Sequence, residues 1–175
     1  PSVPALAGNR SISSRKMYRT GLLARSLGLF APMMARLPPG KVFMVMDNPT
    51  RQKDMAMELI DADMLDLNAK ELEAFANVPT FGTPMNTIKS WVNMEGAKRN
   101  EILTKSPDAG IPCDSVNDEL KEWVKAARKA CGENMRIAIK ADKTTPYKTI
   151  KNVMNSLRSI DESRYNLITT LKSGE

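Results

Sequence analysis

The sequence of 175 residues contains no histidine and only two cysteines. Without histidine, it lacks the commonest general base, the commonest zinc ligand and the usual pH-sensitive side chain. Two cysteines are too few for the ligand sets of ordinary structural zinc sites. Motifs for binding phosphates or dinucleotides, and those of zinc proteases and serine hydrolases, are also absent. We therefore expect no catalytic residue, no metal and no cofactor, and we predict that the chain is not an enzyme.

Acidic residues are missing from the first 40 positions, which hold six arginines and lysines. The remaining residues therefore include 20 of the 26 basic residues and all 20 acidic ones, so the rest of the chain has no net charge. A nucleic-acid-binding domain normally carries its own basic face. We therefore expect no nucleic-acid partner for the main body of the protein.

Long hydrophobic runs are absent as well. A membrane-spanning helix needs about 18 or more consecutive apolar residues. The best candidate, residues 21–37, is interrupted by Arg25, Ser26, Pro32 and Arg36. The sequence therefore predicts no transmembrane helix within this chain.

Residues 1–40 differ in composition from the rest, being rich in proline, serine, glycine and arginine. Three interpretations stay open: a disordered linker or added segment, a transit-peptide-like extension, and an amphipathic segment lying on a membrane surface. Pro38, Pro39 and Gly40 mark its end. We predict that the folded domain spans residues 41–175 and that residues 1–40 lie outside it.

The first part of that domain reads as one strand followed by short helices. Its signals are a β-rich run, then Asn or Thr at helix starts, then a stretch of turn-forming residues. The expected elements are a strand over residues 41–46, a helix capped by Thr50 and ending near residue 62, a helix capped by Asn68 with Glu71 completing a capping box, a helix over residues 85–92, and a polar loop over residues 95–112.

The second part reads as helix, strand, helix, strand. We expect a helix capped by Asp114 or Ser115 and ended by Gly132, a strand over residues 135–141, a helix starting at Pro146, and a strand over residues 165–171. The last two strands should be parallel neighbours, because a helix connects them. The predicted fold is α+β: a small mixed β-sheet with helices mainly on one face, and a helical insertion after the first strand.

The helix predicted between Asp114 or Ser115 and Gly132 separates the two cysteines. Cys113 and Cys131 bracket about 18 helical residues, or about 27 Å at 1.5 Å per residue. A disulfide needs Cα atoms within about 7 Å. We therefore predict free thiols, and the alternative is a disulfide between two chains.

One stretch has a more specific pattern. Residues 135–154 read MRIAIKADKTTPYKTIKNVM, a strand that ends at Lys140 and Asp142 and a helix that opens with Pro146 and Tyr147. This segment resembles the signature of the ExbD/TolR family of biopolymer transport proteins, and residues 165–170 stand where that family has a closing strand. Upstream, Phe81 to Pro84 and residues 111–123 are similar to the longer ExbD variant of Bacteroidetes-type bacteria.

The resemblance implies a function. The chain would be the soluble periplasmic domain of a TonB–ExbB–ExbD-type complex, which uses the proton motive force to support outer-membrane transport. Its implied partners are an ExbB-like channel protein in the inner membrane, a TonB-like protein and a second copy in a homodimer. The family's membrane helix, with the Asp taken to carry protons, is not in this sequence.

The closing strand is our candidate for the partner-binding and dimer-binding site. An exposed strand edge can pair with an extended segment of another protein. The alternative is that this strand is internal to the sheet. The residues of the candidate edge are Tyr165, Asn166, Leu167, Ile168, Thr169 and Thr170.

Two other functions stay open. One is a peptidoglycan-binding module, as TolR-like relatives suggest. The other is a small α/β protein that associates with RNA or the ribosome through the basic N-terminal arm.

Overall fold

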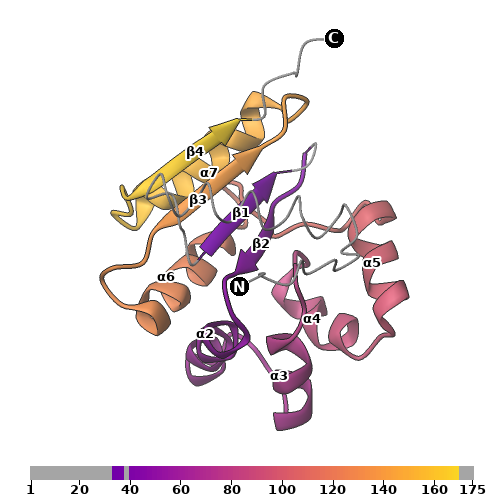
Figure 1. Ribbon diagram of the computed structural model, residues 1–175. Helices are drawn as coiled ribbons and strands as arrows, with labels where there is room; N and C mark the ends of the chain where they lie inside the picture. Colours follow the sequence, from indigo (N-terminus) through magenta and orange to yellow (C-terminus); the bar gives the residue numbers. More distant parts are fainter. Residues whose placement is uncertain (1–32, 38–39, 170–175) are drawn as a thin grey trace, which may run out of the picture. The chain divides into compact units, whose positions relative to one another are not determined.

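The computed structural model describes residues 33–37 and 40–169. The chain divides into two units, Pro1–Phe30 and Ala31–Glu175, and all the described residues belong to the second. The elements of this unit (Figure 1) are β1 (Met33–Leu37), β2 (Phe43–Met46), α2 (Pro49–Asp61), α3 (Ala69–Ala76), α4 (Met85–Val92), α5 (Gly96–Lys105), α6 (Leu120–Cys131), β3 (Ile137–Ala141), α7 (Tyr147–Ser159) and β4 (Tyr165–Thr169).

The strands form a mixed sheet in the order β2-β1-β3-β4. β1 runs antiparallel to β2 and parallel to β3, and β3 runs parallel to β4. The predicted α+β class and the parallel pairing of the last two strands are confirmed. The predicted domain start at residue 41 is wrong, because residues 33–37 form a central strand of this sheet. The interpretations given for residues 1–32 lie outside the described residues.

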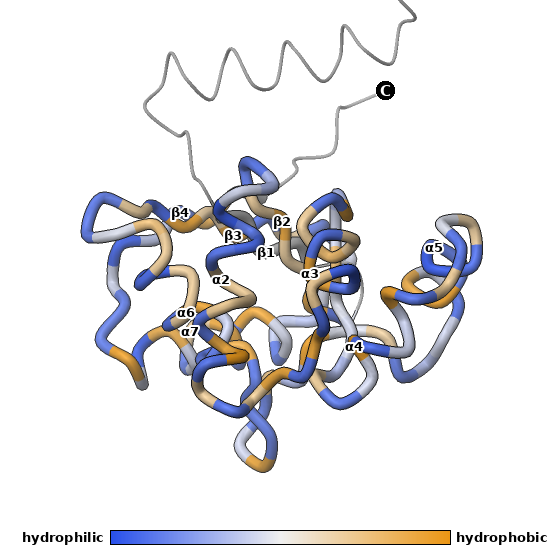
Figure 2. Tube along the Cα trace, turned by 90° about the horizontal axis from the view of Figure 1, so that it is seen from below, coloured by the Kyte–Doolittle hydropathy of each residue, from blue (hydrophilic) through white to orange (hydrophobic). Residues whose placement is uncertain are grey.

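Helices pack on one side of the sheet. Seen from below in Figure 2, the four strands lie along one side of the second unit, and α2, α6 and α7 lie on the same side of them. β3 is buried along most of its length, with Ile137 and Ile139 fully inaccessible to solvent. The core therefore lies between the sheet and these three helices, as the amphipathic pattern of α6 and α7 predicts.

A cluster of three aromatic rings joins the helical insertion to this core. Phe75 of α3, Phe81 of the following loop and Trp123 of α6 have ring centroids 4.8 to 5.8 Å apart. All three side chains are fully buried. Aromatic pairs at such spacings add to the stabilisation from buried area alone.

The start of α2 differs from the prediction by two residues. Asn48, and not Thr50, is the cap, because its side chain accepts a hydrogen bond from the backbone N–H of Arg51 at 2.9 Å. Pro49 then occupies the first helical position, where a missing N–H costs little. The capping box of Asn68 and Glu71 at α3 is confirmed.

The predicted polar loop over residues 95–112 is wrong, because α5 occupies residues 96–105. Its apolar face is narrow, and Leu103 is its one fully buried residue, so the periodicity gave little signal. Two hydrogen bonds attach α5 to α4: Trp91 donates to the carbonyl of Arg99 at 3.2 Å, and Arg99 donates to that of Val92 at 3.0 Å.

The predicted start of α6 is also wrong. The helix begins at Leu120, and Asp114 forms a turn in which its carboxylate accepts the N–H groups of Val116 and Asn117, both at 2.8 Å. Val116, which a helix starting at Asp114 or Ser115 would include, lies in this turn and is 96% exposed. An aspartate carboxylate that accepts nearby backbone N–H groups in this way favours a turn over continuation of a helix. Both cysteines are free, as predicted.

Candidate functional site at the open edge of the sheet

β4 lies at an edge of the sheet. Among the described residues it pairs with β3 alone, in parallel register from Ile137 beside Tyr165 to Ala141 beside Thr169. The strand thus has the edge position predicted from the sequence. Thr170, the last residue of the candidate site, lies outside the described residues.

The opposite edge, along β2, is covered by the helical insertion. Met44 donates its backbone N–H to the carbonyl of Phe81 at 2.8 Å, and Phe81 donates back to Met44 at 3.1 Å. Next to this bridge, Ile111 donates to the carbonyl of Val42 at 2.9 Å. The backbone groups of β2 are therefore engaged on this side, which leaves β4 as the edge better suited to pairing with another chain.

The register of β4 shows which backbone groups point outward. The N–H of Ile137 reaches the carbonyl of Arg164 at 3.4 Å. In a parallel ladder, alternate residues of one strand bond to the neighbour, so Asn166 and Ile168 bond to β3. The N–H and C=O groups of Tyr165, Leu167 and Thr169 then point away from the sheet.

The side chains of this strand also alternate between the two faces. Tyr165 and Leu167 lie on the face that Ile137 and Ile139 share with the helices, because directly paired residues point the same way. Tyr165 is half-buried against the core, whereas Leu167 is 46% exposed. An apolar side chain is therefore displayed at the middle of the open edge.

Helix α7 is the outermost helix beneath this edge. α2 packs on α6 and α6 packs on α7, so the helix layer follows the sheet from β2 towards β4 (Figures 1 and 2). Val153 and Leu157 of α7 are buried in the core, and Ser156 faces the loop before α6.

The side of α7 that carries Ser156 is turned towards α6 and the loop before it, so the opposite side faces away from α6, in the direction of the open edge of β4. Residues spaced three and four positions apart lie together on this side of the helix. Tyr147 and Arg158 are exposed, as is Lys151, and Met154 is half-buried. We call these residues, Tyr147, Lys151, Met154 and Arg158, the outer flank of α7.

The residues of the family motif form the connection from β3 to α7. Lys140 is half-buried in β3. In the turn that follows, the backbone carbonyl of Asp142 accepts the backbone N–H of Thr145 at 2.9 Å. Pro146 precedes the helix, and its carbonyl accepts the N–H of Thr149 at 3.0 Å. The Tyr147 side chain is 75% exposed, because it opens the helix on the outer flank.

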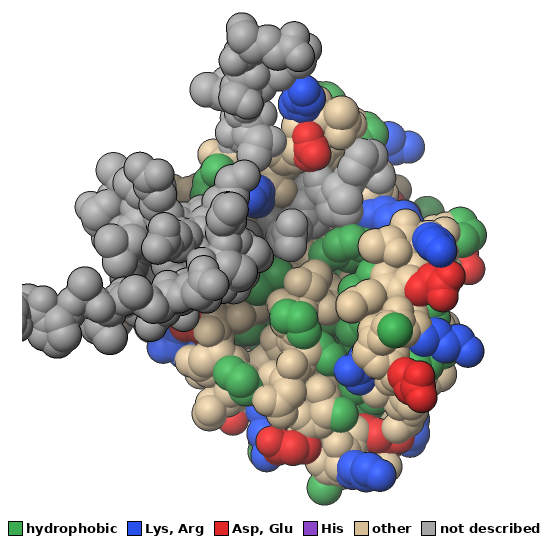
Figure 3. All heavy atoms as spheres, turned by 45° about the vertical axis from the view of Figure 1, so that its right-hand side comes forward, with side chains coloured by type: hydrophobic (Ala, Val, Ile, Leu, Met, Phe, Trp, Pro, Cys, Tyr) green, Lys and Arg blue, Asp and Glu red, His purple; other side chains and the backbone are tan. Residues whose placement is uncertain are grey.

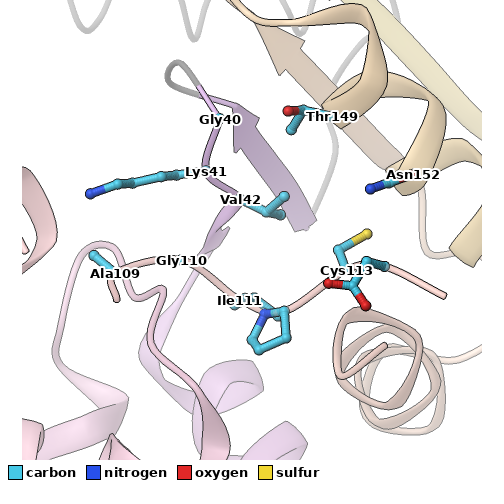
Figure 4. A pocket seen from close by; sticks show the side chains of 11 residues that line it. Gly40, Lys41, Val42, Ala109, Gly110, Ile111, Cys113, Thr149 and Asn152 are labelled. Carbon is cyan, nitrogen blue, oxygen red and sulfur yellow. The ribbon is translucent and has the colours of Figure 1, made fainter. Parts of the chain in front are cut away.

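Two hollows lie on the other side of α7, beside the segment before α6. One has a volume of about 230 Å³, and Figure 4 shows Lys41 and Val42 on one side of it, Cys113 below, and Thr149 and Asn152 of α7 opposite. The second, of about 480 Å³, is lined by hydroxyl, amide and carboxylate side chains, by Val116 and by the basic side chain of Lys148. The sequence predicts neither hollow, because segments far apart in the chain come together to form them.

A buried polar contact joins the same loop to α7. Ser156 donates to the carboxylate of Asp118 at 2.6 Å, and its hydroxyl lies 3.3 Å from the thiol sulfur of Cys113. Burial raises the pKa of the Cys113 thiol to about 11. The thiol is therefore protonated at neutral pH and a poor nucleophile, so this contact serves to hold the loop against the helix.

Within the described ranges, no group of three or more Cys, Asp and Glu side chains has the arrangement of a metal site. The same part of the chain contains no helix that is long and apolar enough to cross a membrane.

Fold and edge together define a small α+β domain with one covered and one open sheet edge. No family model, no curated protein and no solved structure matches the chain.

Proposed function

We propose that this chain is the periplasmic domain of a TonB–ExbB–ExbD-type complex, in which the proton motive force supports outer-membrane transport. In this proposal the domain works by pairing β4 with an extended segment of a TonB-like protein, or with a second copy of itself. An ExbB-like channel protein would be the partner in the inner membrane.

The observation that carries the proposal is the open edge of β4. Its outward N–H and C=O groups, at Tyr165, Leu167 and Thr169, have the alternating spacing that strand addition uses. The other edge is occupied by Phe81. An edge strand left open in this way would promote aggregation unless a partner covers it or its residues prevent pairing.

The motif adds support, because its residues shape the end of the domain next to that edge. Asp142 closes the turn after β3, and Tyr147 begins the helix on whose flank the edge lies. The segment with the strongest family resemblance and the open edge therefore belong to one β3–α7–β4 unit.

Hydrogen exchange tests the proposal directly. The purified chain is mixed with the periplasmic part of the TonB-like protein encoded by the same organism, and exchange of each backbone amide is followed. We expect protection at Leu167 and its outward-facing neighbours, because a paired strand replaces water as their hydrogen-bond partner. Sedimentation of the chain alone reports whether a second copy fills the edge instead.

Two substitutions at one position supply the control. Leu167→Pro removes the outward N–H, whereas Leu167→Ala shortens the side chain and keeps this donor. We expect the proline variant to lose the interaction and the alanine variant to retain most of it. If the proline variant binds as tightly as the unaltered chain, or if no amide of β4 is protected, the proposal is wrong.

A further inference from the structure

The charges of α7 all have one sign. The helix contains Lys148, Lys151 and Arg158 and no acidic residue, and all three cations are exposed. The body of the protein is neutral overall, so this helix is a local concentration of positive charge.

This arrangement does not favour the helix itself. Lys148 lies in the first turn, where the helix dipole favours acidic side chains, and α7 has none there. Lys151 follows three residues later, at a spacing where like charges repel each other. Both effects disfavour the helix, so helix stability does not account for these cations.

In the neighbouring helix α6, three of the four cations form ion pairs with described residues, and Lys121 is the exception. Lys125 pairs with Glu122 at 3.0 Å, Lys129 pairs with Glu58 at 3.4 Å, and Arg128 is held by Glu162. On the face shown in Figure 3, basic and acidic side chains are likewise interspersed. Among the described residues, none of the three cations of α7 is in an ion pair. Two backbone hydrogen bonds and, to a lesser degree, the charge of Lys148 lower the pKa of Asp114, so Lys151 and Arg158 are the two cations of α7 for which this part of the chain shows no acidic partner.

Two of these cations, Lys151 and Arg158, belong to the outer flank, beside the open edge of β4. They are seven residues apart, about 10 Å along the helix. Side chains on one face of a strand recur about every 6.8 Å. The long side chains of lysine and arginine can therefore reach successive same-face positions of a strand added to β4.

We infer that the segment that pairs with β4 is acidic, an inference that rests on the proposed function. It carries carboxylates on the face turned towards α7, where Lys151 and Arg158 receive them. A polypeptide fits this place better than a lipid surface or a nucleic acid, because β4 offers outward backbone N–H and C=O groups that pair with no other strand among the described residues.

Two synthetic peptides test the inference on the full chain. In the first, glutamate alternates with valine. In the second, glutamine replaces every glutamate. We expect the glutamate peptide to bind about tenfold more tightly, which corresponds to about 1.4 kcal/mol shared between two exposed ion pairs. Added salt should reduce this difference, because it screens exposed charges.

Charge-reversal variants identify the residues. Lys151→Glu combined with Arg158→Glu should abolish the preference for the glutamate peptide. Lys70→Glu combined with Lys98→Glu makes the same change in net charge at exposed positions away from β4, and should leave the preference intact. Leu167→Pro should weaken the binding of both peptides.

The outcomes separate this inference from the proposed function. Equal binding of both peptides, or an unchanged preference in the Lys151/Arg158 variant, overturns the inference and leaves pairing at β4 standing. Binding of neither peptide also overturns it, while the exchange experiment with the TonB-like protein decides the proposed function. If these two cations instead bind vesicles of anionic phospholipid and no peptide, the surface belongs to a membrane and the inference is wrong.

Discussion

Glu71 shows how one side chain joins local and distant contacts. One carboxylate oxygen accepts the backbone N–H of Asn68 at 2.9 Å, which completes the capping box of α3. The other accepts the side-chain amide of Asn93, after α4, at 2.8 Å. These two hydrogen bonds, the one from Asn93 first, lower the pKa of Glu71, and the charge of Lys89 adds to the effect.

The lowered pKa predicts how acid affects this site. The charged carboxylate contributes to stability above its ordinary pKa of 4.5, and the contribution is lost as the pH falls through the lower folded value. We expect Glu71→Gln to destabilise the protein at pH 7 and to make the free energy of unfolding less sensitive to acid. Urea unfolding at several pH values measures this. Glu101→Gln, on exposed α5, is the control, and equal acid sensitivity of the Glu71 variant and the unaltered protein would contradict the prediction.

The two thiols should differ in reactivity. Cys113 is buried, and burial raises its pKa to about 11. Cys131 is only half-buried, and burial raises its pKa as well. With a maleimide at pH 8, we expect Cys131 to be labelled in the folded protein and Cys113 only after unfolding. Mass spectrometry of the peptides checks this, with Cys131→Ala as the control. Equal labelling rates would show that the loop before α6 opens readily.

At the scale of elements, hydrogen bonds decide where helices begin and end when the hydrophobic periodicity of the sequence gives little signal. α5 was missed because few of its residues are apolar on one face, although most of them favour helix. The start of α6 was placed too early because Asp114 stabilises a turn. The terminal block was predicted more closely, since β3, α7 and β4 have clear alternation or helical spacing.

The register of β4 makes a prediction that separates adjacent positions. Proline at 166 removes an N–H that bonds to β3, whereas proline at 167 removes one that points outward. We expect Asn166→Pro to lower the melting temperature by several degrees, since about 1 kcal/mol corresponds to about 2–4 °C in a protein of this size. Leu167→Pro should change it less. Thermal unfolding followed by circular dichroism measures both, and a larger loss for Leu167→Pro would show that the register is shifted by one residue.

At the scale of the whole molecule, the sheet depends on β1. This strand lies between β2 and β3 and connects the N-terminal hairpin and helical insertion to the β3–α7–β4 unit. Without it, β2 and β3 are not neighbours, and each would have an open edge in the middle of the sheet.

Two truncations test this role. Removing residues 1–30 deletes only the first unit, and we expect the remaining chain to unfold cooperatively. Removing residues 1–40 deletes β1 as well, and we expect loss of cooperative unfolding. Circular dichroism during heating distinguishes them. A folded chain starting at residue 41 would show that β1 is dispensable and would restore the domain boundary predicted from composition.

The sequence alone determined the fold class, the capping box at Asn68 and the β3–α7–β4 order, because these follow from spacing and local hydrogen bonds. It also indicated Tyr165–Thr169 as a strand. Only the tertiary structure decided that Met33–Leu37 belongs to the sheet, that Phe81 covers one edge while β4 is open, and that Lys151 and Arg158 lie beside that edge. The physical reason is that composition and periodicity report neighbours within a few residues, whereas strand pairing and the facing of helices depend on contacts between residues far apart in the chain.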